Sequence, residues 1–443
     1  MRRLLFIFSF LSLLVVDGKA QEVETLTLED CLRIGIDNNL SLEGKRKEIQ
    51  KSKYGVSENR SKLLPQITVI AGYNNNFDPP VSVTDGSSYG VPYNITKTLQ
   101  HTANAGLEMQ MPLFNQTLYT SMSIAKVMEE ISRLSYGKAR EDIIMQISKM
   151  YYLGQVTAEQ IVLIKANITR LEELRDITQA FFDNGMSMEV DLKRVNINLE
   201  NLKVQYDNAQ AMMKQQLNML KYIMDYPAEK EFVLTPVNTD SITTVALTGL
   251  SENIYEFQLS QSQVQLAEKQ KKIISNGYIP SLSLTGSWRY AAYTDKGYHW
   301  FHSGPSNHWF RSYGLGLTLR IPIFDGLDKT YKIKKAMIDI ENSKLAWENA
   351  RKSLQTQYLN AVNDLMNNQR NFKKQKDNYL LAEDVYTVTS DRYREGIASM
   401  TEVLQDEMQM SEAQNNYISA HYNYRVTNLM LLKLTGQIES LVK

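Results

Sequence analysis

Apolar and polar residues alternate along two stretches of the chain, one between Pro65 and Pro112 and the other between Pro280 and Pro322. A period of two is typical of a strand that has one apolar and one polar face. Each stretch holds two alternating segments of about ten residues, with aromatic residues near their ends. The pattern therefore predicts four strands. Their alternating apolar positions fall within 67–73, 103–111, 282–290 and 313–321.

Outside these stretches, apolar residues recur every three or four positions, as they do in an amphipathic helix. No proline occurs between Pro112 and Pro227 or after Pro322. The segment from Pro112 to Gly185 would reach on the order of 110 Å as one helix, too long for the core of a single globular domain. Such helices are predicted to pair as coiled-coil-like hairpins. They would reverse at Gly185 and Gly396, because glycine leaves the right-handed helical conformation without strain.

The landmarks of the first half recur in the second half, in the same order and at nearly constant offsets of 215, 210 and 211 residues. The matched pairs are Pro65 with Pro280, Pro112 with Pro322, and Gly185 with Gly396. Repetition of this kind indicates duplicated structural units. Residues 21–245 and 246–443 are therefore predicted to be two copies of one unit, which would contain a helix, a strand pair and a long helical hairpin.

The first twenty residues have the pattern of a secretory signal. Arg2 and Arg3 precede an apolar run, and small residues end the segment before Gln21. We predict a signal peptide at 1–20 that is removed from the mature chain; an uncleaved membrane anchor is the alternative. Cys31 is the only cysteine, so no intramolecular disulfide can form. It also lies too far past the predicted cut to be a lipoprotein cysteine.

Charge and motif content exclude several classes of protein. The chain has 49 basic and 49 acidic residues and no basic block, which argues against a nucleic-acid binder. No glycine-rich phosphate loop, nucleophile-elbow spacing or HExxH motif is present, so the chain is predicted not to be an enzyme and to need no cofactor. Beyond the signal, no run of roughly 18 apolar residues predicts a membrane-spanning helix.

Strands of this length match the thickness of a bilayer when they are tilted. Four strands alone would leave two open edges, and unpaired backbone groups cannot face lipid, so the strands would have to close a barrel with other copies. The alternative is a water-exposed four-stranded sheet packed on a helix. The secretory signal, the aromatic strand ends and the very long helices favour the barrel. On that interpretation, Val69, Leu107, Leu284 and Leu317 face lipid, and Gln66, Glu108, Thr285 and Arg320 face the lumen.

From Leu26 to Gly436 the chain resembles the TolC-type outer-membrane efflux protein family. The resemblance rests on the duplicated layout, on the strand-to-helix junctions at Pro112 and Pro322, and on the segment 392–404, which is similar to the family's second hairpin tip. It implies a mixed α+β membrane protein that assembles as a homotrimer. Three chains would form a twelve-stranded transmembrane β-barrel in the outer membrane of a Gram-negative bacterium and a periplasmic α-barrel of helical hairpins.

The same resemblance implies an exit duct of a tripartite efflux or type I secretion system, engaged by a periplasmic adaptor and an inner-membrane pump. The adaptor would dock on the two hairpin tips, at Gly185, Met186, Ser187, Gly396, Ile397 and Ala398. The periplasmic gate would involve Glu402, Asp406, Asp191 and Tyr393. The family pattern favours acids six and nine positions after the second tip glycine. Glu402 matches the first position, but Gln405 occupies the second, followed by Asp406. A Tyr393 phenol donating to Asp191 would hold neighbouring hairpins shut.

Two other interpretations remain open from the residues alone. A non-transporting periplasmic adaptor or envelope scaffold would also contain long coiled-coil helices. His299, His302 and His308 cluster between the last two predicted strands, and several methionines lie near the hairpin tips. Imidazole and thioether groups bind transition metals, but a surface loop and ordinary helix packing explain these residues better. No metal site is predicted.

Overall fold

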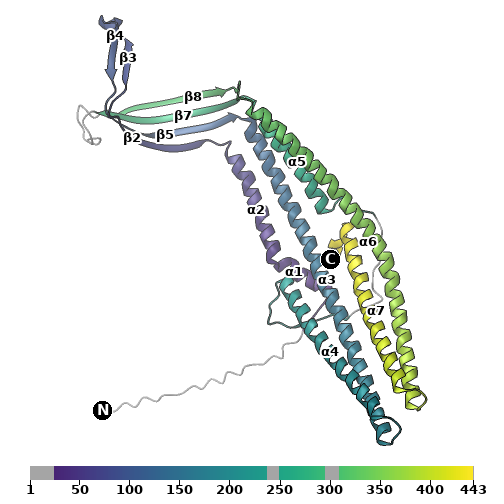
Figure 1. The fold of residues 1–443 in the computed structure, drawn as a ribbon. Coiled ribbons are helices and arrows are strands. Elements are labelled where there is room, and N and C mark those ends of the chain that lie inside the picture. The colour runs from purple at the N-terminus through teal and green to yellow at the C-terminus, as the bar shows by residue number, and fades with distance from the viewer. Residues whose placement is uncertain (1–23, 237–248, 295–308, 443) are drawn as a thin grey trace, which may run out of the picture. The chain divides into compact units, whose positions relative to one another are not determined.

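The computed structural model describes residues 24–236, 249–294 and 309–442 (Figure 1). The chain divides into two compact units. The first comprises Met1–Leu40, Glu141–Gly249 and Tyr358–Lys443, and the second comprises Ser41–Arg140 and Leu250–Gln357. Each predicted repeat, 21–245 or 246–443, therefore contributes segments to both units. The signal peptide predicted at 1–20 lies outside the described residues, as does the cluster of His299, His302 and His308.

All four predicted strands are present, and they form one antiparallel sheet in the second unit (Figure 1). Their order is β2-β5-β7-β8. The bounds are β2 (Gln66–Asn75), β5 (His101–Phe114), β7 (Ser281–Thr294) and β8 (Trp309–Arg320). Because β2 and β8 are at the two ends of this order, each has one edge without a strand partner in the described part of the chain.

A further hairpin in the second unit was not predicted from the sequence. It consists of β3 (Val81–Asp85) and β4 (Tyr93–Lys97), joined through a short 3-10 turn at Ser87–Tyr89. Each of these strands has only five residues. A run this short gives too few alternating apolar and polar positions to predict a strand.

The second unit also contains α2 (Leu40–Ser61), α5 (Tyr255–Asn276) and the first part of two long helices, α3 (Gln116–Asp183) and α6 (Asp328–Arg394). Polar contacts join these helices. The Ser52 and Ser132 hydroxyls of α2 and α3 lie 2.7 Å apart, and the Asn276 amide of α5 donates to the Thr120 hydroxyl of α3 at 2.6 Å.

The first unit contains α1 (Leu28–Asn38), α4 (Glu189–Met224), α7 (Met400–Leu434) and the remaining parts of α3 and α6. Two three-residue strands, β1 (Glu24–Leu26) and β6 (Phe232–Leu234), pair in parallel, and a 3-10 helix (Ile438–Val442) follows α7. Buried apolar clusters hold this unit together, and two of them contain most of the clustered residues. One includes Leu32, Ile147 and Met224, and the other, nearer the hairpin ends, includes Leu171, Val195 and Val403.

The long helices agree with the sequence pattern except at one point. The 68 residues of α3 form one helix of about 100 Å. The segment 26–64, which contains no proline and would read as one helix, is divided into α1 and α2 at Asn39, whose backbone leaves the helical region at φ −56°, ψ 118°. The Asn39 side-chain amide donates to the carbonyl of Ile223 on α4 at 2.8 Å, which anchors the break. Among the helices described, none has a stretch long and apolar enough to cross a membrane.

Candidate functional site

The strand register places the predicted lipid-facing residues on one face of the sheet. In the ladder, Val69 lies opposite Leu107, and Leu284 lies opposite Leu317. Directly opposed residues share a face, and side chains alternate along each strand, so all four lie on the same side. Gln66, Glu108, Thr285 and Arg320 occupy the other side by the same reasoning.

The apolar face is largely uncovered in the single chain. Val69 is 73% exposed and Leu315 is 79% exposed. Aromatic residues lie on this face towards the end of the sheet where β7 ends and β8 begins. Trp288 and Tyr290 stack edge to face at 5.3 Å, and Arg311 lies over the Tyr313 ring at 5.9 Å. An exposed apolar band bordered by aromatic side chains is typical of a strand face in contact with lipid.

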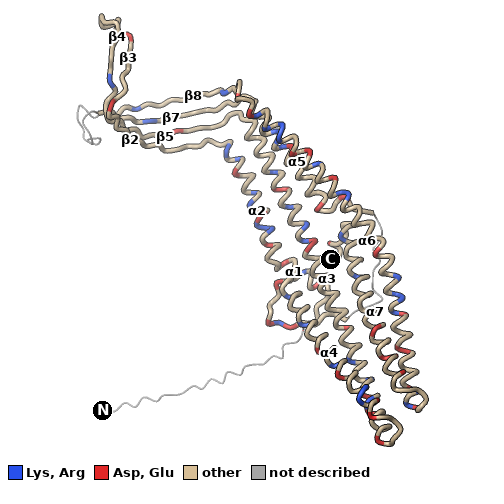
Figure 2. Tube along the Cα trace, viewed as in Figure 1, with Lys and Arg blue, Asp and Glu red and all other residues tan. Residues whose placement is uncertain are grey.

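The polar face is hollowed into a trough of about 630 Å³. One ion pair stands in it, formed where the Glu108 carboxylate accepts from the Arg289 guanidinium at 2.5 Å. The other lining residues are uncharged, and Gly314 and Gly316 leave part of the wall without side chains. Figure 2 shows how sparse charged residues are along the four strands and how frequent they are along the helices of the same unit.

The two predicted hairpin tips are helix reversals of the same construction. Gly185 has a φ of 73° and Gly396 has a φ of 75°. At the first tip, the Gly185 amide donates to the carbonyl of Phe182 at 2.9 Å, and the Met186 amide donates to Phe181 at 2.8 Å. The second tip repeats both bonds, which together form a Schellman cap. The prediction that the helices reverse at these glycines is confirmed.

Side chains at the tips differ in exposure. Met186 is 69% exposed and Ile397 is 62% exposed, so both stand out from the helix ends. Ser187 is half-buried, and Ala398 packs against the neighbouring apolar cluster. Among the six residues predicted to dock the adaptor, Met186 and Ile397 are therefore the large apolar side chains that lie exposed.

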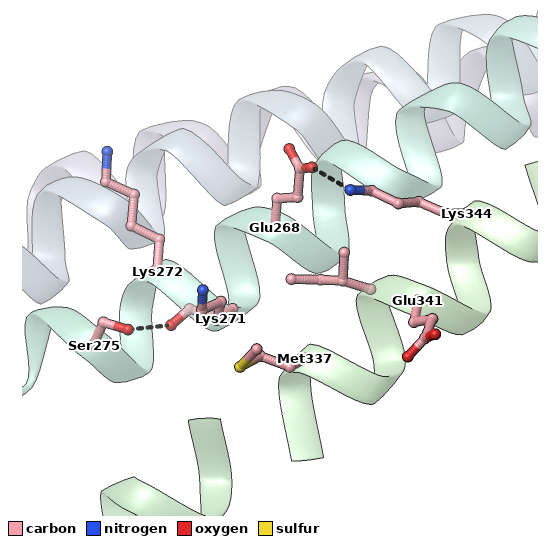
Figure 3. A pocket seen from close by; sticks show the side chains of 8 residues that line it. Glu268, Lys271, Lys272, Ser275, Met337, Glu341 and Lys344 are labelled. Atoms are coloured by element: carbon pink, nitrogen blue, oxygen red, sulfur yellow. Dashed lines mark hydrogen bonds and ion pairs between the residues drawn. The ribbon is translucent and has the colours of Figure 1, made fainter. Parts of the chain in front are cut away.

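A groove runs between α5 and α6 within the second unit (Figure 3). It has a volume of about 580 Å³, and Glu268 and Lys344 approach to 3.9 Å across it. Glu341 and Lys344 also line an adjoining groove of about 610 Å³, which reaches Trp347. Met337 and Leu345 of α6 lie exposed at these grooves.

A family model for outer membrane efflux proteins matches residues 34–224 and 252–437. The chain belongs to the outer membrane efflux protein family. The match covers both halves of the chain, including the four strands and both hairpin tips. The resemblance found in the sequence is thereby confirmed, together with the expectation of an efflux channel in the outer membrane. Membership gives no support to a non-transporting adaptor or scaffold, and the family is one of transport proteins.

Individual relatives and solved structures agree with this assignment. The chain is 21% identical to the outer membrane protein TolC of Vibrio cholerae, over 86% of this chain and 84% of that protein. It is 23% identical to a probable efflux pump outer membrane protein, TtgC, of Pseudomonas putida, over 81% of this chain and 75% of that one. A structure of CusC shares the fold with a TM-score of 0.77 at 16% identity, covering 96% of this chain and 95% of that chain. The CmeC channel of Campylobacter jejuni gives 0.75 at 17% identity, covering 93% and 85%.

The residues expected at the gate of this efflux protein are not joined as expected. The Tyr393 hydroxyl donates to the Thr178 hydroxyl at 3.3 Å, not to Asp191, and the Tyr393 ring is buried against Phe181 with centroids 5.6 Å apart. Asp191 pairs with Arg194 on its own helix at 3.3 Å. The predicted bond from Tyr393 to Asp191 is therefore wrong within the chain, because the tyrosine packs inward between α6 and α3.

Glu402 has a structural role that was not expected. Its backbone amide donates to the Ser399 hydroxyl at 3.3 Å, and its carboxylate accepts from the Ser399 amide at 2.9 Å. This reciprocal pair is a capping box at the start of α7. The Ser-x-x-Glu spacing was readable in the sequence. Asp406, one turn further along, is half-buried.

Ion pairs and hydrogen bonds join the two hairpins of the first unit near their tips. Arg394 of α6 pairs with Glu173 of α3 at 3.3 Å. Arg194 of α4 donates to the Thr401 hydroxyl of α7 at 3.4 Å. Together with the Tyr393 hydrogen bond, these contacts hold α6 and α7 against α3 and α4 at the end where the gate is expected.

Sequence reasoning missed a row of buried polar residues on α7 at seven-residue spacing, which we call the polar ladder. Its members are Glu407, Gln414, His421 and Asn428. The apolar residues Val403, Met410, Tyr417, Tyr424 and Leu431 recur beside it with the same period. A heptad with one polar core position is typical of helices whose alignment is specified by polar contacts. In the sequence, the polar ladder corresponds to a polar residue at every second core position of α7.

One member of the polar ladder, Gln414, is hydrogen-bonded to α3, and a second, His421, lies beside an α3 carboxylate. The Asn167 amide donates to Gln414 at 2.7 Å. The His421 ring is fully buried, and its Nε2 accepts from Arg425 at 3.0 Å while its Nδ1 lies 3.4 Å from the Glu159 carboxylate. One oxygen of the Glu159 carboxylate accepts from the Tyr417 hydroxyl at 2.9 Å. Among the described residues, its other oxygen and His421 Nδ1 are buried without a hydrogen-bond partner.

The other two members of the polar ladder, Glu407 and Asn428, also have unsatisfied polar atoms. In the described part of the chain, one Glu407 carboxylate oxygen and both side-chain amide atoms of Asn428 are buried without a hydrogen-bond partner. Burial raises the pKa of Glu407 above its ordinary value, and the nearby Arg170 charge only partly opposes this. Buried polar atoms without hydrogen-bond partners therefore recur along α7, beside the apolar residues that pack it against α3. The described residues hold no cluster of three metal-binding side chains.

Proposed function

We propose that three copies of this efflux protein close one twelve-stranded barrel and form a continuous exit duct for a tripartite efflux or type I secretion system. The observation that carries the proposal is the open four-stranded sheet. Its edge strands β2 and β8 have 10 and 12 residues, and its apolar face is exposed. Unpaired strand edges cannot persist in lipid, so the edges must pair with other copies.

The helical part of the second unit supports association between copies. Met337, Ile338 and Leu345 are large apolar residues of α6 that lie exposed in the single chain. The grooves between α5 and α6 combine such residues with charges of both signs. A neighbouring copy that places its own helices there would cover this surface. The same association would bring three sets of hairpins around one axis.

The hairpin tips would receive the periplasmic adaptor, with the inner-membrane pump beyond it. Met186 and Ile397 would make the apolar contacts, and Gly185, Ser187, Gly396 and Ala398 would allow close backbone approach. Glu402, Asp406 and Asp191 would line the entrance. The contacts of Tyr393 with Thr178 and of Arg394 with Glu173 would hold the closed state, because opening must draw α6 and α7 away from α3. The protein would act only as a duct.

The docking role is tested by site-specific photocrosslinking in cells. A photoreactive residue at Met186 or Ile397 should crosslink to one periplasmic protein and leave trimer formation intact. The same residue at Tyr222, exposed at the far end of α4, is the control and should give no such product. Substitution of the tip glycines is a poor test, since both have positive φ and a side chain there is strained.

Ile397→Asp should retain trimers but lose export of a substrate, because it adds a charge to the docking surface without altering Gly396. Normal export by both Met186→Asp and Ile397→Asp would show that the adaptor docks elsewhere. Absence of outer-membrane trimers in the unaltered protein would instead contradict the duct itself.

A further inference from the structure

The polar face of the sheet carries few charges, and they do not cancel. On the described strands β2, β5, β7 and β8, the register assigns three charged residues to this face: Glu108, Arg289 and Arg320. Glu108 and Arg289 pair with each other at 2.5 Å. No ion pair to Arg320 is found among the described residues, and its side chain is exposed. Each chain therefore presents one uncompensated positive charge on this face.

Arg320 is too distant from Glu108 to be neutralised by it. In the ladder, Glu108 lies opposite Ser287, and Arg320 lies opposite Ser281. Six residues of strand separate these two levels, which corresponds to about 20 Å. The Debye length at physiological ionic strength is about 8 Å, so solute ions at the level of Arg320 would experience its charge and little of the Glu108 charge.

We infer that the strand lumen, meaning the part of the duct that the β-strands line, favours anionic solutes. Arg320 is its specificity-determining residue, because the ion pair with Glu108 neutralises the charge of Arg289. The inference rests on the proposed three-chain duct, in which three copies of Arg320 form one ring where the strands meet the helices. Rings of arginine or lysine select anions in pores, and substitutions in a barrel lumen tune selectivity. The Glu108–Arg289 pair adds no net charge, although it narrows the trough where it stands.

The class of cargo that this charge favours is anionic. Solutes that carry carboxylate, sulfonate or phosphate groups would be concentrated at the Arg320 ring, and cationic solutes would be depleted there. The effect concerns the strand lumen and adds to whatever selectivity the periplasmic entrance imposes. It is therefore measured as a difference between variants that share the same entrance.

Reversal potentials of purified channels in planar bilayers under a KCl gradient test the inference. Arg320→Gln should lower the chloride-to-potassium permeability ratio on the order of twofold, and Arg320→Lys should retain the parental ratio. Glu108→Gln should shift the ratio in the opposite direction, because it unmasks Arg289. The double variant Glu108→Gln with Arg289→Gln removes both charges and should match the parent.

Arg311→Gln is the control on the same strand. Arg311 lies on the apolar face, so its removal should leave the permeability ratio unchanged. Conducting Arg320→Gln and Glu108→Gln channels with the parental ratio would overturn the inference and leave the duct standing. If one of the two variants fails to assemble, the other still decides the matter. A parent protein that forms no channel would overturn the duct itself.

Discussion

The side-chain amide of Asn167 on α3 donates to the side-chain oxygen of Gln414 on α7 at 2.7 Å, and both side chains are buried. These residues are 247 positions apart in the chain, and each belongs to a different helical hairpin. Their bond is the best-formed contact of the polar ladder. Buried amide pairs of this kind specify the alignment of packed helices at a cost in stability. The position of α7 along α3 is therefore fixed by polar contacts rather than by apolar packing alone.

Replacing either Asn167 or Gln414 alone should reduce the stability of the folded protein more than replacing both. Gln414→Leu leaves the Asn167 amide buried without its partner, which should destabilise the protein by about 1–3 kcal/mol. The double variant Asn167→Leu with Gln414→Leu should recover part of that loss. Thermal unfolding of the four proteins in a double-mutant cycle measures the coupling. Strictly additive effects would mean that the hydrogen bond contributes nothing.

Glu407 should lower stability at neutral pH. Burial raises its folded-state pKa above the ordinary value of 4.5, so the ionised form is disfavoured in the folded protein. The protonated side chain carries no such penalty, so the protein is most stable below the pKa of Glu407 in the unfolded chain. That stability is lost as the pH rises through the pKa of Glu407 in the folded protein. Glu407→Gln should therefore be more stable than the parent at pH 7, and the difference should vanish below about pH 4.

The control for that comparison is Glu412→Gln, which removes an exposed carboxylate from the same helix. Unfolding midpoints measured from pH 4 to pH 8 should show little difference between this variant and the parent. A Glu407→Gln variant that loses stability at pH 7 would indicate that the carboxylate is held in a favourable ionised contact.

Leu284 and Thr285 are neighbours in β7 that lie on opposite faces of the sheet. Leu284→Arg would place a charge on the lipid side, at a cost of roughly 2–4 kcal/mol per chain near mid-bilayer. Thr285→Arg would place the same charge in the lumen and should be tolerated. The yield of assembled protein in outer-membrane fractions measures both. Similar losses from the two changes would contradict the assignment of faces.

Glu402 can be tested as a gate residue without loss of its cap. Glutamine also serves in a capping box, so Glu402→Gln should preserve the start of α7 and remove the charge. If three Glu402 carboxylates meet at the entrance, this variant should weaken the block of conductance by divalent cations applied from the periplasmic side. Glu402→Ala removes the charge and the bond from the Ser399 amide to the carboxylate, while the Ser399 hydroxyl still caps the backbone amide at position 402. Parental block in the glutamine variant would leave Glu402 as a cap only.

The strands and hairpin reversals could be predicted because their signals are local. The alternating residues of β7 and β8 indicate extended backbone. Gly185 and Gly396 indicate helix ends, and neither signal depends on residues elsewhere in the chain. The break at Asn39 depends on a carbonyl of Ile223 that is remote in sequence, so no local pattern reveals it. The β3–β4 hairpin was missed because its strands are too short for a clear period.

The candidate site was less predictable than the fold for the same reason. Resemblance placed Tyr393 near Asp191, but the direction of the ring follows from packing between α3 and α6, which sends the hydroxyl to Thr178. The polar ladder was overlooked since Glu407 and His421 look like ordinary polar residues until the helix face is known. By contrast, the capping box at Ser399 and Glu402 was present as a local motif and needed only to be recognised.

The number of chains in the assembled channel tests the account most directly. Native mass spectrometry of the protein, extracted from outer membranes in detergent without heating, should give a mass of three mature chains. Heating should convert this species to single chains. A conducting channel that contains one or two chains would contradict the proposal that β2 and β8 close a barrel between three copies.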